Sequence, residues 1–155
     1  MNNNNNKQDF GFVCIGIGAT LIANVYLSVS VSKARKKYGI QYPKLYADVS
    51  DIDEKGKCKN QKDVEKFNCV QRGHQNTLET LAVVQLLGVL NGLAFPRFSA
   101  TCLGLYAVGR ILYGRGYAAN GPKGRFTGAI LSHLGDLPLM ICTFYLGFKL
   151  IQGGL

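Results

Sequence analysis

A chain of 155 residues has room for one domain, and its 47% of hydrophobic residues is ordinary for a globular protein. The distribution is not ordinary, because the charged residues crowd into short stretches between long apolar runs. With such runs, a net charge of +9 argues against a nucleic-acid partner and for a membrane protein whose cations set its orientation and meet anionic head groups. The first and last runs lack the polar face that a soluble helix needs, which disfavours a soluble bundle.

The chain begins with an asparagine-rich segment, residues 1–9, which we expect to be a disordered tail. The apolar run Phe10–Ser32 follows and ends in the stop-transfer pattern Lys33–Lys37. The segment lacks the basic start and the A-x-A exit of a cleaved signal peptide. We therefore expect a membrane helix over about residues 10–38.

The next stretch, Gly39–Lys66, is charged and of mixed sign. We expect it to be a solvated, mobile loop with a short helical turn near Asp63–Lys66. Its cysteines, like the others in the chain, are scattered, so neither a disulfide framework nor a metal site is expected.

Three further apolar runs approach the ~20 residues that cross a bilayer as a helix: Thr77–Phe95, Ser99–Ala119 and Phe126–Ile151. The expected helices cover about residues 67–95, 98–119 and 125–152, with a turn at Asn120–Gly124. The sequence thus predicts an all-α fold, an integral membrane bundle of four transmembrane helices that forms one domain over residues 10–152.

The basic residues predict the orientation of this bundle. Ten Lys/Arg lie between Lys33 and Lys66, and two more lie between the third and fourth helices, whereas the other side holds only Lys7, Arg97 and Lys149. By the positive-inside rule, the first and third connections are cytosolic and both termini are lumenal or external.

Two helices carry polar stripes. At 100° per residue, Arg72, Asn76 and Glu79 of the second helix fall within about 60° of one another. In the third helix, Arg110 shares a face with Tyr106, Tyr113 and Tyr117, spaced i, i+4, i+7 and i+11. Arg110 lies deep in an apolar run, where a charge needs a partner, and Glu79 is its expected counter-ion.

The topology brings the polar residues of all four helices to the cytosolic side, where we expect them to form a pocket. Its cations suit a ligand with more than one carboxylate, and Glu79 and Asn76 suit an ammonium or peptide group. A small zwitterionic peptide fits this set. A cation beside a thiol also lowers the pKa of the thiol and favours the reactive thiolate.

The motifs Ser32–Tyr38, Phe67–Glu79 and Gly109–Tyr117 resemble those of the MAPEG family, the membrane-associated proteins in eicosanoid and glutathione metabolism. The resemblance runs from about Gly11 to Phe148. It implies a homotrimer of four-helix subunits that holds glutathione, as co-substrate, between neighbours near the cytosolic face. Residue by residue, it implies glutathione contacts for the following side chains: Arg35, Arg72, His74, Asn76, Glu79, Tyr113 and Tyr117.

The resemblance also assigns catalytic roles. The arginine that stabilises the glutathione thiolate falls at or beside Arg125, and Lys36 stands where leukotriene-C-forming members have a second arginine, proposed there as an acid/base group. The sequence departs from the family pattern at Thr80, which replaces an aromatic residue, and in the longer loop Asp48–Lys66. Because Thr80 is not aromatic, the glutathione contact that the family makes at this position is not expected here. His74 points about 160° away from Asn76, so a structural or interfacial role is an alternative to the glutathione contact for this residue.

The function implied is a microsomal, endoplasmic-reticulum glutathione transferase or peroxidase that acts on lipid electrophiles, as in leukotriene biosynthesis, or on lipid hydroperoxides. The alternative is a non-catalytic lipid-binding protein of the lipoxygenase-activating type. A transporter or channel subunit is a third reading, suggested only by the intramembrane Arg110 and Glu79.

Overall fold

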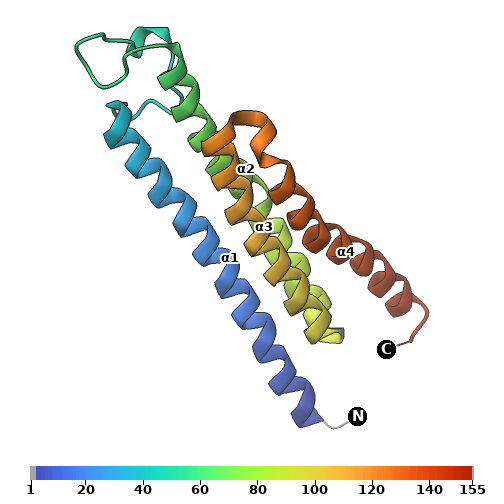
Figure 1. Ribbon diagram of the computed structural model, residues 1–155. Helices are drawn as coiled ribbons and strands as arrows, with labels where there is room; N and C mark the ends of the chain where they lie inside the picture. The colour runs from blue at the N-terminus through green and yellow to red at the C-terminus, as the bar shows by residue number, and fades with distance from the viewer. Residues whose placement is uncertain (1–2, 155) are drawn as a thin grey trace.

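The computed structural model describes residues 3–154 and is helical throughout, with no strand among those residues. Its elements, in chain order, are α1 (Asn3–Tyr38), the 3₁₀ turn η1 (Val49–Asp51), α2 (Gln61–Ala94), α3 (Pro96–Asn120), the 3₁₀ segment η2 (Gly121–Arg125) and α4 (Phe126–Ile151). Figure 1 shows these helices as a long bundle, with both termini at one end and the α1–α2 connection at the other.

Two helices begin earlier than the sequence predicts. α1 begins at Asn3, so the tail expected to be disordered over residues 1–9 is helical from that residue, while residues 1 and 2 lie outside the described part. Extending an existing helix adds one hydrogen bond per residue without a new nucleation cost, which explains why a polar tail can continue it. α2 begins at Gln61 rather than near residue 67, because the Asn60 side chain caps it by accepting a hydrogen bond from the backbone N–H of Asp63 at 3.2 Å.

α3 is the central helix and packs against the other three. Glycines let it approach α4 closely: at Gly109 a side-chain carbon would collide with the backbone of Ser132, and at Gly128 with the backbone of Tyr113. α3 ends at Asn120 and is capped by Gly121, whose φ of +68° strongly favours glycine. The chain then reverses through η2 into α4 (Figure 1).

Three helical stretches are long and apolar enough to cross a membrane: Gln8–Tyr38, Gln61–Ala94 and Pro96–Ile151. Their outer surfaces carry large apolar side chains in the open, among them Ile22, Phe144 and Ile151, which are 69%, 76% and 87% exposed. A surface of this kind requires lipid around it. The chain is an integral membrane protein, and the four separate spans expected from the sequence stay a prediction because the third stretch contains α3, η2 and α4 together.

The α1–α2 connection, residues 39–60, is not the solvated and mobile loop expected from its charges. Ile40, Ala47 and Cys58 are buried against Tyr38 and Phe67, in a small core of their own. Burial raises the pKa of the Cys58 thiol.

Polar contacts fix this connection further. The Asn68 side chain exchanges two hydrogen bonds of 2.8 Å with the backbone of Ala47. The Lys44 ammonium lies 2.9 Å from an Asp48 oxygen and 2.6 Å from an Asp51 oxygen. Hydrogen bonds from Ser50 and Lys44 lower the pKa of Asp48 to about 2.

Candidate functional site

The polar stripe predicted on α2 is present and internally bonded. Arg72 Nη1 lies 2.6 Å from Glu79 Oε1, and Asn76 Nδ2 donates to Glu79 Oε2 at 3.2 Å. The three side chains meet because they recur at i, i+4 and i+7 along one face of the helix. The Arg72 and Glu79 side chains remain 40% and 44% exposed, so both keep open positions for another molecule.

The predicted ion pair between Glu79 and Arg110 is wrong. Arg110 is 4% exposed and donates from Nε to Thr77 Oγ1 at 2.9 Å and from Nη2 to Asn76 Oδ1 at 2.7 Å. Its guanidinium also lies 4.3 Å from the ring centroid of Tyr113. Asn76 stands between the two charges, accepting from Arg110 and donating to Glu79, while Glu79 reaches Arg72 on its own helix.

The aromatic residues predicted on α3 extend this arrangement toward η2. The Tyr113 and Tyr117 rings are in edge contact, with centroids 5.8 Å apart, and both side chains are buried. The guanidinium of Arg125, exposed at the end of η2, lies 5.4 Å from the Tyr117 ring centroid. We call this connected series the α2–α3 network; its members are Arg72, Asn76, Glu79, Arg110, Tyr113, Tyr117 and Arg125.

Arg35 and His74 are not part of the α2–α3 network. They line a separate cavity of about 420 Å³ between α1, the α1–α2 connection and α2, which we call the α1–α2 cavity. Ser32, Tyr42, Gln71 and Gln75 also line it. Lys36 lines an adjoining hollow with Arg35 and Tyr42.

The α1–α2 cavity contains buried polar atoms that lack partners. Arg35 is 7% exposed and Gln71 5%, yet Nε and Nη1 of Arg35 and Oε1 of Gln71 have no hydrogen-bond partner among the described residues. Nε2 of His74 is in the same state. Buried polar groups normally find partners, because an unsatisfied one costs about 1–3 kcal/mol. Three such side chains around one cavity make it a candidate site for a polar ligand.

Aromatic rings hold Arg35 in place. Its guanidinium lies 4.3 Å from the ring centroid of Tyr42 on one side and 5.4 Å from that of Phe67 on the other. The neighbouring connection is anchored to α2 by Tyr46, whose hydroxyl donates to Gln75 Oε1 at 2.6 Å. The α1–α2 connection therefore takes part in forming the cavity.

The residues of the pocket predicted at the cytosolic side fall into two half-sites, the α1–α2 cavity and the α2–α3 network. Positions 74 and 76 point about 160° apart on α2, but Gln75, which lines the cavity, lies only about 40° from Glu79. The α1–α2 cavity and the α2–α3 network therefore occupy adjacent faces of that helix. Both contain cations and uncharged hydrogen-bonding groups suited to a carboxylate-bearing peptide. Thr80, at the position where an aromatic residue was expected, makes a 2.6 Å hydrogen bond with the Tyr106 hydroxyl instead.

Tyr42, Gln71 and Thr77 were not predicted as site residues from the sequence. A signal for Gln71 was present, because Gln71, His74 and Gln75 form a second polar stripe on α2 at i, i+3 and i+4. Thr77 lies between the two stripes and was assigned to the start of the apolar run. Tyr42 lies outside any helix, and no periodicity marks it.

Comparison of the chain with protein families gives a match to the MAPEG family over residues 13–145, which is most of the chain.

Proposed function

The chain belongs to the MAPEG family, and we propose that it is a membrane-bound glutathione transferase and peroxidase that acts on lipids. We propose that it is similar to the type 3 microsomal glutathione S-transferases within this family, on the motifs given above. The observation that carries the proposal is the pair of unpartnered nitrogens on the buried Arg35, in a cavity that also holds the unpartnered Gln71 and His74. A glutathione carboxylate satisfies such a guanidinium, and the peptide amides satisfy the other two groups.

The two half-sites favour a homotrimer. In the homotrimer that the family resemblance implies, a glutathione between two copies can contact the α1–α2 cavity of one copy and the α2–α3 network of the other. The partly exposed Arg72 and Glu79 lie on an apolar helix that faces lipid in a single chain, where a charged pair is costly. A neighbouring subunit covers this pair in the proposed assembly.

In the proposed reaction, glutathione loses its thiol proton and the thiolate is stabilised by Arg125, as the family resemblance assigns. In conjugation, sulfur bonds to an epoxide carbon, the carbon–oxygen bond breaks, and the oxygen takes a proton, for which Lys36 is the proposed donor. In peroxide reduction, two glutathiones become one disulfide while the lipid hydroperoxide becomes an alcohol and water. Leukotriene biosynthesis uses the first chemistry.

We place the protein in the endoplasmic reticulum membrane, with the α1–α2 and α3–α4 connections cytosolic and both termini lumenal. Twelve of the basic residues lie in these two connections and in the helix ends beside them, as the positive-inside rule requires of cytosolic segments. This orientation opens the glutathione site to the cytosol and its walls to the bilayer, from which a lipid substrate enters.

Binding of glutathione to the detergent-purified protein tests the function. An enzyme binds glutathione and shows thiolate absorbance at neutral pH. A lipid-binding protein of the lipoxygenase-activating type retains fatty acid but neither binds glutathione nor ionises its thiol. The second result would replace the enzyme by this alternative.

A further inference from the structure

A second feature lies on the far side of α1 from the candidate site. A cavity of about 300 Å³ lies between α1 and α3, with Val70 of α2 forming part of its wall, and its other lining residues include Tyr26, Leu27, Ser30, Arg115 and Ala118. A larger hollow of about 630 Å³ lies between the same two helices nearer the termini and includes Phe12, Ile15, Ala19, Arg97, Ala100 and Gly104. We call this surface the α1–α3 groove.

The groove follows one continuous face of α1. Positions 12, 15, 19, 26 and 30 are separated by three, four or seven residues, the spacing of a single helical stripe. Ser28, Ser32 and Arg35, which line the α1–α2 cavity, form a stripe about 160° away. Subunit contacts through the Arg35 side of α1 therefore leave the groove facing the bilayer.

The length of the groove matches the bilayer. Arg97 and Arg115 are eighteen residues apart on α3, which corresponds to about 27 Å along the helix. The hydrocarbon core of a membrane is ~30 Å thick. The two arginines therefore lie near the two head-group levels, and the walls between them lie at the depth of the acyl chains.

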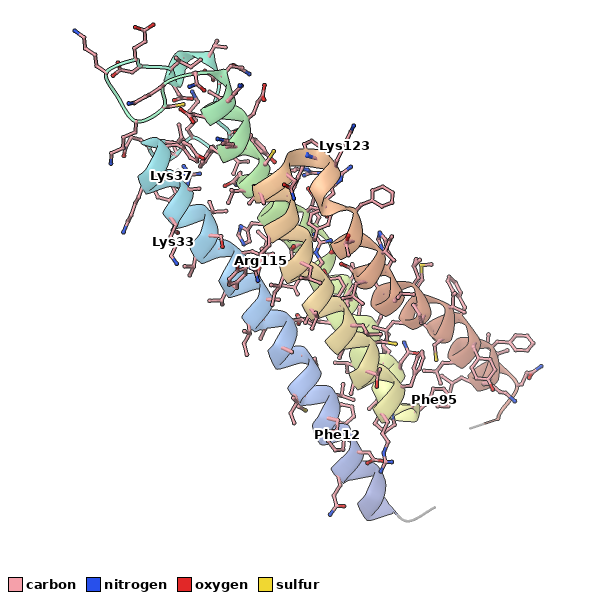
Figure 2. The ribbon with its side chains drawn as sticks, in the orientation of Figure 1. Phe12, Lys33, Lys37, Phe95, Arg115 and Lys123 are labelled. Atoms are coloured by element: carbon pink, nitrogen blue, oxygen red, sulfur yellow. The ribbon has the colours of Figure 1, made fainter. Side chains whose placement is uncertain are left out.

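The two ends differ in charge. Arg97 is already paired, because its Nε lies 3.0 Å from an Asp9 oxygen. No carboxylate lies within ion-pair distance of the exposed Arg115 in the part of the chain that the structure describes. Lys33 lies one turn beyond Ser30 on the same stripe of α1, and Figure 2 shows both cations toward the same end of the bundle. An unneutralised pair of cations beside an apolar cavity suits an anionic head group.

We propose that the α1–α3 groove binds one anionic phospholipid of the leaflet at the Arg115 end. Its phosphate is held by Arg115 and Lys33. One acyl chain occupies the cavity beside Tyr26 and Leu27, where the small side chain of the exposed Ala118 leaves space that a larger one would fill. At the opposite end of the groove, Arg97 is already paired with Asp9, so it creates no preference for an anionic head group. This site depends on the membrane placement of the chain and not on its reaction with glutathione.

Native mass spectrometry of the full-length protein in detergent tests the site, with phosphatidylserine and phosphatidylcholine of identical acyl chains as probes. The wild type should retain phosphatidylserine preferentially. Arg115→Ala should weaken this retention about fivefold, which corresponds to the ~1 kcal/mol expected of one cation at an anionic surface. Lys66→Ala is the matched control, because it removes one exposed cation from α2, outside the groove, and should leave retention unchanged.

A second variant tests the acyl-chain cavity. Ala118 is exposed, so Ala118→Leu should fold normally, which its thermal unfolding verifies, and should weaken retention of both lipids by filling the cavity. Equal losses in Arg115→Ala and Lys66→Ala would show that net charge alone attracts the lipid, and would overturn the site. Unchanged lipid retention in Ala118→Leu would overturn the placement of the acyl chain.

Discussion

Glu79 accepts its hydrogen bond from Arg72, two turns earlier on the same helix, at a distance of 2.6 Å. Arg110, the charge it was expected to neutralise, is held by the neutral oxygens of Thr77 and Asn76. The consequence is a division of roles. The bonds of Arg110 hold α3 to α2, and the partly exposed Arg72–Glu79 pair remains accessible to a ligand.

Thr77→Val and Glu79→Gln separate these roles. Thr77→Val keeps the shape of a buried side chain but removes the acceptor of Arg110 Nε, so it should lower the stability of the protein by about 1 kcal/mol. Glu79→Gln should leave stability nearly unchanged and weaken glutathione binding, because Arg72 loses its partner. Thermal unfolding in detergent and glutathione titration measure the two effects. The reverse ranking would mean that Glu79 is the structural partner of Arg110 after all.

Tyr42 should act as a positioning residue for Arg35. The centroid of its ring lies 4.3 Å from the Arg35 guanidinium. Tyr42→Leu removes this cation–π contact, and such a contact contributes about 0.5–2 kcal/mol. We expect glutathione affinity to fall roughly threefold or more while turnover at saturating glutathione changes little. Tyr42→Phe keeps the ring and should behave like the wild type. If both variants lose affinity equally, the hydroxyl and not the stacking is responsible.

The α1–α2 connection should loosen in acid. The pKa of Asp48 is lowered from 3.8 to about 2, so its charged form is favoured in the folded connection. That contribution is fully present above pH 3.8 and is lost as the pH falls through about 2. Pepsin digestion between pH 4 and 2 should therefore cut residues 39–60 increasingly as the pH falls. Asp48→Asn should be cut readily across the whole range, and a pH response identical to that of the wild type would exclude Asp48 as the titrating group.

The proposed orientation predicts a protection pattern in sealed microsomes. Protease added outside should cut the exposed part of the connection, around Glu54–Lys57, and should spare a tag fused after Leu155. Detergent should abolish the protection of the tag. Loss of the tag with an intact connection would reverse the topology and place the glutathione site on the lumenal side.

Periodicity was sufficient to predict the helical fold and the two polar stripes. The spacing of Asn76 and Glu79 predicts their contact, since neighbours at i+3 meet on a helix surface, whereas the bond from Arg72 to Glu79 spans two turns. The partner of Arg110 is a different problem. It depends on the rotation of α3 against α2, which brings Thr77 and Asn76 nearer than Glu79.

The folded α1–α2 connection and the division of the site into two half-sites could not be predicted from the sequence, for a related reason. The Asn68–Ala47 pair joins residues 21 positions apart, and no local pattern in a charged stretch indicates such a contact. Of the residues of the expected pocket, Arg35 and His74 line the α1–α2 cavity, and the others belong to the α2–α3 network. Their separation follows from the position of α1 beside the His74 face of α2, which is a matter of helix packing and not of composition.

Arg125 is the residue on which the proposed mechanism depends most. It lies at the end of η2, with its guanidinium 5.4 Å from the Tyr117 ring, and its exposed position leaves it free to approach a thiolate. Arg125→Ala should lower turnover by ~10²-fold, the scale of losing one electrostatic stabiliser, with little change in glutathione affinity. Arg72→Ala should do the opposite and mainly raise the glutathione concentration required.

Turnover, glutathione affinity and thiolate absorbance together distinguish the two variants. If Arg125 stabilises the thiolate, Arg125→Ala raises the pKa of bound glutathione and its absorbance at neutral pH disappears, whereas Arg72→Ala retains the absorbance once the site is saturated. Lys123, which is also exposed on η2, provides the comparison: Lys123→Ala should keep both turnover and absorbance. If Lys123→Ala loses them and Arg125→Ala does not, the stabilising cation is Lys123, two residues earlier in the same segment.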